Sequence, residues 1–235
     1  MIALLCLAAM LVVPPASLDP IQIWGAFERD VRDQRIEKTE AKALFPQIYG
    51  QLKELCRPDD FKESGRWVFP VQGYTLRDVG KGGFRPYIRY GLSPIKGYNF
   101  YDGNRHGGHP AYDIFIRDKN MDCLDDRTHK AVNVLAPVDL LVLSTYEEWH
   151  KGSEIRGGNY VWALDPIHDR IFYFAHLLKV EAQAGSVCRA GDVIGTVGRT
   201  GASAASTRSP THLHFMVLSV KRDELASFDY WGFLR

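Results

Sequence analysis

The chain has 235 residues, of which 46% are hydrophobic and 24% are charged, and its formal net charge is +1 at pH 7. This length is enough for one well-buried domain with a smaller appendage, and the composition is typical of a globular protein. Proteins that bind nucleic acids usually carry a clear basic excess, which this chain lacks, so we expect no nucleic acid partner.

The first segment of the chain, MIALLCLAAMLVVPPAS, contains no charged side chain. Its apolar run of about 12 residues is too short to span a membrane and is typical of the core of a signal peptide. We therefore predict a signal peptide over residues 1–17 and an exported protein, periplasmic or extracellular. The basic residues that usually begin a signal peptide are missing, so a short membrane anchor or a buried helix is the alternative. We expect contact with a membrane only through this segment, if it stays uncleaved.

Three cysteines, Cys56, Cys123 and Cys188, follow the predicted signal peptide. In an oxidising compartment an odd number permits one disulfide and one free thiol. Three buried free thiols fit equally well, so the sequence does not decide the pairing.

Residues 18–65 are predicted to form a helical N-terminal region. Apolar residues recur there at spacings of three and four, which is the period of a helix face. They are Trp24, Phe27 and Val31 in one run and Ile48, Leu52 and Leu55 in the next. Proline suits the first turn of a helix and disfavours helix in the residue before it, so we predict two helices divided at Pro46.

Residues 66–235 are predicted to form a β-rich domain. Short apolar or alternating runs follow one another there, separated by Gly, Pro, Asn and Asp, which is typical of an antiparallel β-sandwich or an open barrel. The runs are RWVFPV, YDIFI, VDLLVLS, NYVWALD, RIFYFAH, DVIGTVG and LHFMVLSV. The predicted fold class is therefore mainly β, with a short α-helical N-terminal appendage.

Three stretches of this domain carry histidines in patterns that suggest a site. GGHPAYDIFI contains His109 and Asp113, FYFAHLL ends a predicted strand at His176, and THLHF contains His212 and His214. Successive side chains of a strand point to opposite faces, so His212 and His214 share one face. The even offset between His109 and Asp113 keeps those two on one side of an extended chain.

These residue types suit a catalytic zinc site. Zinc accepts histidine nitrogen and aspartate oxygen, and a catalytic site usually has three protein ligands and an open fourth position. The His-x-x-x-Asp pair with one histidine of the His-x-His pair supplies three ligands. Two histidines are then left for proton transfer near neutral pH. Partly exposed histidines on an edge strand are the competing interpretation.

The order of these pieces resembles that of the lysostaphin-type (LytM-like) zinc metallopeptidases, peptidase family M23. The resemblance runs from FPVQGY to FMVLS, through GGHPAYDI, APVDLLVLS, GGNYVWALD, YFAHL, AGDVIGTVGRTGAS and THLHF. It implies an antiparallel peptidase core and one Zn²⁺ ion bound by His109, Asp113 and His214. It also implies that His176 and His212 are the catalytic pair that orients or deprotonates a water molecule and stabilises the oxyanion, without saying which is the general base.

The resemblance implies a zinc metalloendopeptidase that cleaves peptide cross-links or stem peptides of bacterial peptidoglycan. Two alternatives stay open. One is a catalytically inactive relative that activates another wall hydrolase, and the other is an endopeptidase that acts on a protein substrate. The sequence does not predict the oligomeric state.

The segment after Asp113 departs from a minimal family member because it is longer and more acidic. Asp118, Asn120 and Asp122 alternate as at the start of a calcium loop. The Gly and Glu that a calcium loop needs at its sixth and twelfth positions are missing. We expect a solvated acidic loop over residues 118–126, with a calcium site as the less favoured alternative.

The other histidines are expected in surface loops, and His106 is the one near enough to His109 to reach a substrate groove. They are His106, His129, His150 and His168. Asn99 and Asn104 are the residues that would cover an open metal position in a latent form, an interpretation we do not favour. Asn159 is expected to support a turn or the wall of the groove, in a structural role.

Overall fold

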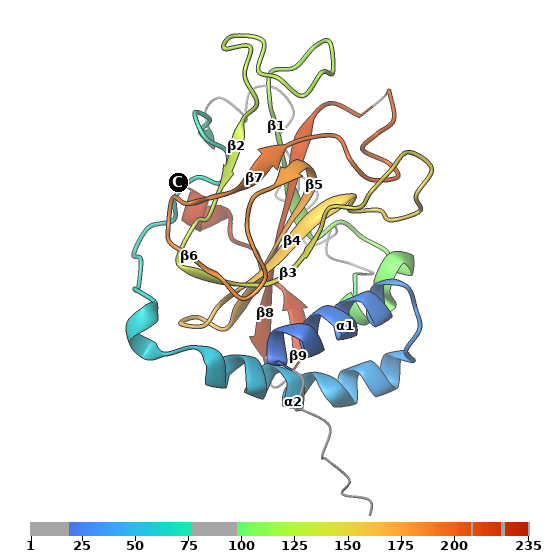
Figure 1. The fold of residues 1–235 in the computed structure, drawn as a ribbon, viewed down its shortest axis with the longest axis vertical. Helices are drawn as coiled ribbons and strands as arrows, with labels where there is room; N and C mark the ends of the chain where they lie inside the picture. The colour runs from blue at the N-terminus through green and yellow to red at the C-terminus, as the bar shows by residue number, and fades with distance from the viewer. Residues whose placement is uncertain (1–18, 77–97, 208, 222–223, 235) are drawn as a thin grey trace, which may run out of the picture.

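The computed structural model describes residues 19–76, 98–207, 209–221 and 224–234. Two helices, α1 (Pro20–Arg32) and α2 (Lys38–Leu55), precede the strands and lie side by side beneath the sheet in Figure 1. The strands are β1 (Ala111–Phe115), β2 (Asn133–Leu135), β3 (Leu140–Tyr146), β4 (Asn159–Asp165), β5 (Arg170–Val180), β6 (Val187–Cys188), β7 (Val193–Val197), β8 (His212–Lys221) and β9 (Glu224–Ser227). Short 3₁₀ turns are η1 (Pro58–Asp60), η4 (Phe100–Arg105) and η5 (Trp231–Leu234). The predicted signal peptide lies outside the described residues.

The nine strands of the described residues form one antiparallel sheet, whose main path has the order β1-β8-β5-β4-β3-β6. Strand β7 pairs with β2 and β5, and β9 pairs with β8. The two ends of the order, β1 and β6, do not pair, so the sheet is open. The prediction of a mainly β, antiparallel fold with short N-terminal helices is confirmed.

The sheet separates two hydrophobic cores because alternate residues of each strand face opposite sides. Along β8, Leu213, Phe215 and Val217 belong to the core among the strands and loops, here called the strand core. Met216 and Leu218 face the other way, into the core under the helices, here called the helix-side core. His212 and His214 have the same parity as this second pair, so the helix-side face of β8 begins with the two histidines.

The helices cover the helix-side face through aromatic packing. The Trp24 side chain is fully buried, its ring stacks on Phe100 at 6.2 Å, and it meets Trp162 of β4 edge-on at 6.3 Å. Helix α1 begins with Pro20 at its first position, and the Asp19 carboxylate caps it by accepting from the Ile21 amide at 3.1 Å. The helices and the sheet therefore share one core, and the 18–65 boundary of a separate helical region stays a prediction.

The prediction that Pro46 divides two helices is wrong. Helix α2 runs through Pro46, and the helices divide instead at Gln34, which takes a left-handed φ of 58°. Phe45 and Ile48, on either side of the proline, are buried against the helix-side core, and this tertiary packing outweighs the lost backbone hydrogen bond. Leu55, expected on the apolar face, is exposed at the end of α2.

The run RWVFPV does not form the predicted strand. It is irregular except for a single bridge between Val71 and Val134, although Trp67 and Val71 are buried in the strand core. The apolar residues of this segment are therefore buried against the sheet, but the segment is not one of its strands.

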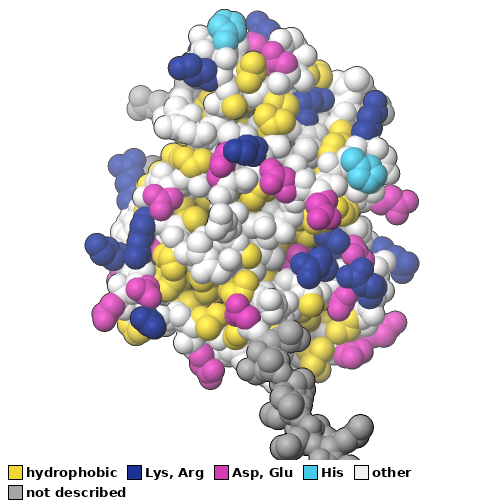
Figure 2. Space-filling model, viewed as in Figure 1, with side chains coloured by type: hydrophobic (Ala, Val, Ile, Leu, Met, Phe, Trp, Pro, Cys, Tyr) yellow, Lys and Arg dark blue, Asp and Glu magenta, His cyan; other side chains and the backbone are white. Residues whose placement is uncertain are grey.

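Two general features of the described residues complete the fold. Cys56, Cys123 and Cys188 are all free thiols, so no disulfide joins them. No helix within the described ranges is long and apolar enough to cross a membrane. On the face shown in Figure 2, acidic and basic side chains are interspersed, in keeping with the net charge of +1.

Candidate active site

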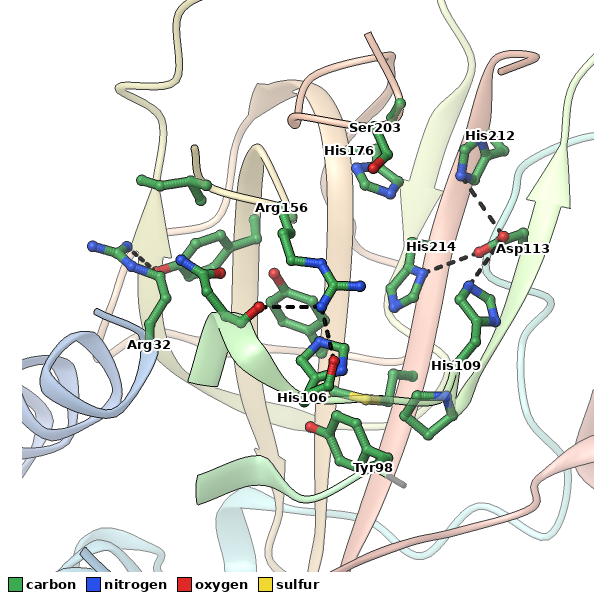
Figure 3. Close-up of a pocket in the computed structure, with 18 of the residues that line it drawn as sticks. Arg32, Tyr98, His106, His109, Asp113, Arg156, His176, Ser203, His212 and His214 are labelled. Atoms are coloured by element: carbon green, nitrogen blue, oxygen red, sulfur yellow. Dashed lines mark hydrogen bonds and ion pairs between the residues drawn. The ribbon is translucent and has the colours of Figure 1, made fainter. Parts of the chain in front are cut away.

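The antiparallel pairing of β1 with β8 brings two of the three histidine-bearing stretches together. Asp113 lies directly opposite His214, and Phe115 lies opposite His212. His214 Nδ1 is 3.1 Å from Asp113 Oδ1, and His212 Nε2 is 3.9 Å from Asp113 Oδ2. His109, just before β1, places Nε2 3.2 Å from Asp113 Oδ2. Figure 3 shows the three imidazoles arranged around this carboxylate.

One nitrogen or oxygen atom from each of His109, Asp113 and His214 lies within 4.8 Å of the other two. Ligands on a tetrahedral zinc ion, with bonds of about 2.0–2.2 Å, lie about 3.4 Å apart. The shorter spacings of 3.1 and 3.2 Å around Asp113 are close to that value. The donor set therefore fits a divalent metal such as zinc.

The ionisation of two of these groups also suits a metal. Burial raises the pKa of Asp113, but hydrogen bonds from His109 and His214 outweigh it and hold the pKa well below its usual range. Burial lowers the pKa of His214 to about 4, against the opposing effect of Asp113. At neutral pH the aspartate is thus charged and His214 is neutral, which are the forms that bind metal ions.

His109 differs from His214. Burial lowers the pKa of His109, but its hydrogen bond to Asp113 and the negative charge of that carboxylate outweigh burial and raise the pKa. The side chain is 47% exposed. Its proton therefore has a free path to solvent, which suits a ligand that must give up a proton when a metal binds.

A β-bulge aims His176 into the same site. In the pairing of β5 with β4, Leu177 lies opposite Asn159 and Ala175 lies opposite Tyr160, so His176 is an extra residue. It takes a left-handed φ of 63°. Simple alternation would turn His176 toward the strand core with Phe174, whereas the bulge turns it toward the site and returns Leu177 to the strand core.

Backbone carbonyls hold the rings of His176 and His212. His176 Nδ1 is 2.8 Å from the carbonyl of Thr200, and His212 Nδ1 is 2.7 Å from that of Pro210. A carbonyl only accepts, so Nδ1 of each ring carries a proton, and the neutral tautomer with this proton leaves Nε2 able to accept. The ring centroids of the two histidines are 4.9 Å apart. Burial, with the nearby His212 and His214, lowers the pKa of His176 well below its usual value.

A cavity of about 500 Å³ contains all five predicted site residues, His109, Asp113, His176, His212 and His214. Figure 3 shows the imidazoles at one end of this cavity and Arg32, from helix α1, at the other. The β3–β4 loop contributes Ile155 and Arg156 to the wall, and α1 contributes Glu28 and Arg32. The structure thus brings the five residues together, while their individual roles stay a prediction.

The α1 end of the cavity carries a buried carboxylate. Glu28 is 3% exposed, accepts from the hydroxyl of Tyr160 at 3.0 Å, and has the Ser144 hydroxyl at 3.4 Å. Arg32 donates to the same tyrosine oxygen at 2.7 Å. Burial raises the pKa of Glu28 from 4.5 to about 7, against the opposing charge of Arg32.

We expect the free energy of unfolding to fall as pH rises from about 5 to 8, because the buried Glu28 loses its proton over this range. The pKa of this group is higher in the folded than in the unfolded chain, so its contribution is complete below pH 4.5 and is lost as pH rises through about 7. The loss is of order 3 kcal/mol, because one pKa unit corresponds to about 1.4 kcal/mol. In Glu28→Gln, whose side chain stays neutral, urea unfolding at pH 5 and pH 8 should show this difference removed.

The exposed Glu54 on helix α2 gives a matched control, since Glu54→Gln removes a carboxylate without changing a buried one. If the free energy of unfolding of Glu28→Gln changes between pH 5 and pH 8 as much as that of the wild-type protein and of Glu54→Gln, the buried carboxylate does not cause the pH dependence of stability.

Of the other residues that the sequence analysis singled out, two line the cavity and two have structural roles elsewhere. His106 and Asn104 line the cavity, and burial lowers the pKa of His106. Asn99 caps η4 by accepting from the Tyr101 amide at 3.0 Å, which commits its side chain away from a metal. Asn159 is buried and accepts from the Trp149 amide at 3.1 Å, so its expected structural role is confirmed.

The other predicted surface residues lie away from the cavity. His129 and His150 are exposed, and His168 is half-buried with its Nδ1 3.0 Å from Asp165. In the acidic loop, Asp118 accepts from the backbone amides of Asp122 and Cys123. Asp118 therefore organises the loop, and in the described part of the chain these carboxylates form no cluster with the spacing of metal ligands.

Sequence reasoning missed Glu28, Arg32 and Arg156 as cavity residues. A signal existed for Glu28, which lies at the helical spacing of Trp24 and Val31 and so falls on the apolar face of its helix. A charged residue on an apolar face needs a partner when it is buried. Arg156, in a loop next to two glycines, offers no comparable signal.

Comparison with known proteins gives a family match over residues 121–225, to the model of peptidase family M23. This range contains His176, His212 and His214 and begins after His109 and Asp113. A search of the curated proteins finds no match.

Solved structures give weaker similarities. A zinc-containing peptidase from Vibrio cholerae is 18% identical with a TM-score of 0.36, over 57% of this chain and 33% of that one. Lysostaphin from Staphylococcus simulans is 24% identical with a TM-score of 0.37, over 54% and 43%. A LytM from Ruminococcus gnavus, described as a candidate glycyl-glycine endopeptidase, is 22% identical with a TM-score of 0.48, over 83% and 70%.

The aligned part of this chain thus spans less than half of the Vibrio cholerae peptidase and of lysostaphin. At these identities and TM-scores the similarities are too weak to support an inference of function. The family match is specific to the part of the sheet that carries three of the five site residues. Residues 121–225 of this chain therefore resemble peptidase family M23.

Proposed function

We propose that the protein is an exported zinc-dependent endopeptidase that cleaves the peptide part of bacterial peptidoglycan. The observation that carries the proposal is the convergence of three potential ligands and two further histidines on one cavity, in a chain whose residues 121–225 match a peptidase family. The wall as the place of action rests on the resemblance of the sequence motifs, from FPVQGY to FMVLS, to the lysostaphin-type peptidases. Export rests on the apolar segment at residues 1–17, and N-terminal sequencing of the mature protein tests it.

In this proposal His109, Asp113 and His214 are the three protein ligands of a zinc ion. A bound zinc ion would supply Lewis-acid polarisation of the peptide carbonyl and lower the pKa of a nearby water molecule. Asp113 also contacts all three surrounding imidazoles, so it fixes the orientation of the group as well as its charge.

His176 and His212 move protons in this proposal. Each ring has its Nδ1 held by a carbonyl, so in its neutral form each offers Nε2 as a base beside the proposed metal ligands. One accepts the proton of the attacking water, and the protonated ring then donates to the leaving amine. The second imidazole, in its form protonated at Nε2, donates that hydrogen to the carbonyl oxygen as negative charge develops there.

Wall digestion with and without a chelator tests the proposal. Purified peptidoglycan should release peptide fragments with new amino termini when the zinc-loaded protein is added. We expect EDTA to abolish the release and added Zn²⁺ to restore it, because the proposed ligands supply one open metal site. Mass spectrometry of the fragments identifies the bond.

Other outcomes decide between the alternatives. A zinc content near zero, with no release of fragments but faster digestion by a second wall hydrolase, would show an inactive activator. Cleavage of a protein substrate with no release of wall peptides would show a different substrate. Either result overturns the proposed activity.

A further inference from the structure

Two arginines line the cavity, and they differ in their partners. Arg32 is satisfied, because it donates to Asp33 at 2.6 and 2.8 Å and to Tyr160 at 2.7 Å. Arg156 forms no ion pair with any residue that the structure describes. Its Nη1 donates to the carbonyl oxygens of Asn104, at 3.2 Å, and His106, at 3.0 Å.

Among the described residues of the cavity wall, no acidic side chain is available to Arg156. The acidic residues among the described lining are Glu28 and Asp113. Glu28 is bound to Tyr160 beside Arg32, and Asp113 is bound to the histidines of the proposed metal site. No residue that the structure describes in this cavity therefore compensates the positive charge of Arg156.

The geometry of Arg156 suits recognition of an anion beside the proposed metal ligands. Figure 3 shows its guanidinium inside the cavity, between His106 and the group of His109 and His214. Two hydrogen bonds through Nη1 hold the guanidinium in place. Its Nε–Nη2 edge makes no hydrogen bond to the described residues, and such an edge binds a carboxylate through two parallel hydrogen bonds.

We propose that Arg156 is a specificity residue that binds a carboxylate of the peptide substrate next to the scissile bond. The inference rests on the proposed endopeptidase function and deepens it by naming the charge that the substrate carries. A free carboxyl terminus and a side-chain carboxylate offer the same chemistry to the guanidinium. Peptides with either group near the cleaved bond are then preferred over their amides.

The test compares soluble wall peptides with free carboxylates and the same peptides after amidation. The zinc-loaded wild-type protein should cleave the free acids with a kcat/KM about 10- to 100-fold higher, the range expected for hydrogen bonds to a charged group. Arg156→Gln should lower this ratio to near one, mainly by raising KM for the acids. Arg156→Lys, which keeps the charge without the planar edge, should keep part of the preference.

Controls separate recognition from a structural role. Arg105→Gln removes another exposed arginine, which ends η4 beside Asn104 and is outside the cavity lining, and should leave the ratio unchanged. If Arg156 only fixes the carbonyls of Asn104 and His106, Arg156→Gln should slow acids and amides equally. Synthetic peptides of the cleaved sequence, amidated at the terminus alone or at the side chain alone, identify which carboxylate is bound.

The outcomes also distinguish this inference from the proposed function. Equal cleavage of acids and amides by the wild-type protein overturns the carboxylate site and leaves the endopeptidase proposal intact. An acid preference that persists in Arg156→Gln does the same. If the zinc-loaded wild-type protein cleaves no wall peptide, the endopeptidase proposal itself fails.

Discussion

His214→Ala is expected to remove both the metal and the activity of the protein. His214 is half-buried, neutral at pH 7, and 3.1 Å from the carboxylate of Asp113, so its loss leaves two of the three proposed ligands. We expect the zinc content after dialysis to fall from about one ion per chain to near zero. The rate of peptide release should fall at least about 1000-fold, because Lewis-acid activation is worth several kcal/mol.

The matched control is His150→Ala, which removes an exposed histidine outside the cavity lining. Zinc analysis by mass spectrometry and thermal unfolding should show that this control keeps both metal and fold. A His214→Ala protein that is folded and retains one tightly bound zinc ion would contradict the ligand assignment.

His212→Ala is expected to separate metal binding from turnover. The ring belongs to the same strand face as His214, but its Nε2 is 3.9 Å from Asp113 and its Nδ1 is fixed by the Pro210 carbonyl. We therefore expect the variant to keep most of its zinc and to lose about 100- to 10 000-fold in kcat, the range for a general acid or base. Measured zinc content and kcat on the same preparation check this result.

His176→Ala should behave in the same way, because His176 is the other imidazole held by a carbonyl beside the metal group. A pH profile of kcat for the two variants assigns their roles, since loss of the general base removes the acidic limb. Full activity in either variant would show that the corresponding histidine is not part of the proton-transfer pair.

The sequence by itself determined the features that follow from local covalent geometry. Alternation along a strand places His212 and His214 on one face and Leu213 on the other, and the structure shows this division, with Leu213 in the strand core. The even offset of His109 and Asp113 likewise puts both in one cavity. The mainly β fold class also followed from short apolar runs separated by turn residues.

Tertiary structure decided where alternation fails. Regular alternation along β5 would point His176 away from the site. The bulge at His176, with its left-handed φ, points the side chain into the site, and this bulge depends on the pairing of β5 with β4. Gly201 contributes to this arrangement, because a Cβ there would lie 2.9 Å from His176 Nδ1. No pattern within FYFAHLL specifies a bulge, since the extra residue is defined by the opposite strand.

Packing between distant segments decided the rest of the cavity. Helix α1 places Glu28 and Arg32 in the wall of a site whose histidines lie far later in the chain. Helix α2 continues through Pro46 because burial of Phe45 and Ile48 outweighs a local backbone preference. Local geometry thus fixed which residues share a face, and long-range contacts fixed which faces meet, since their energies depend on partners that no short stretch of sequence contains.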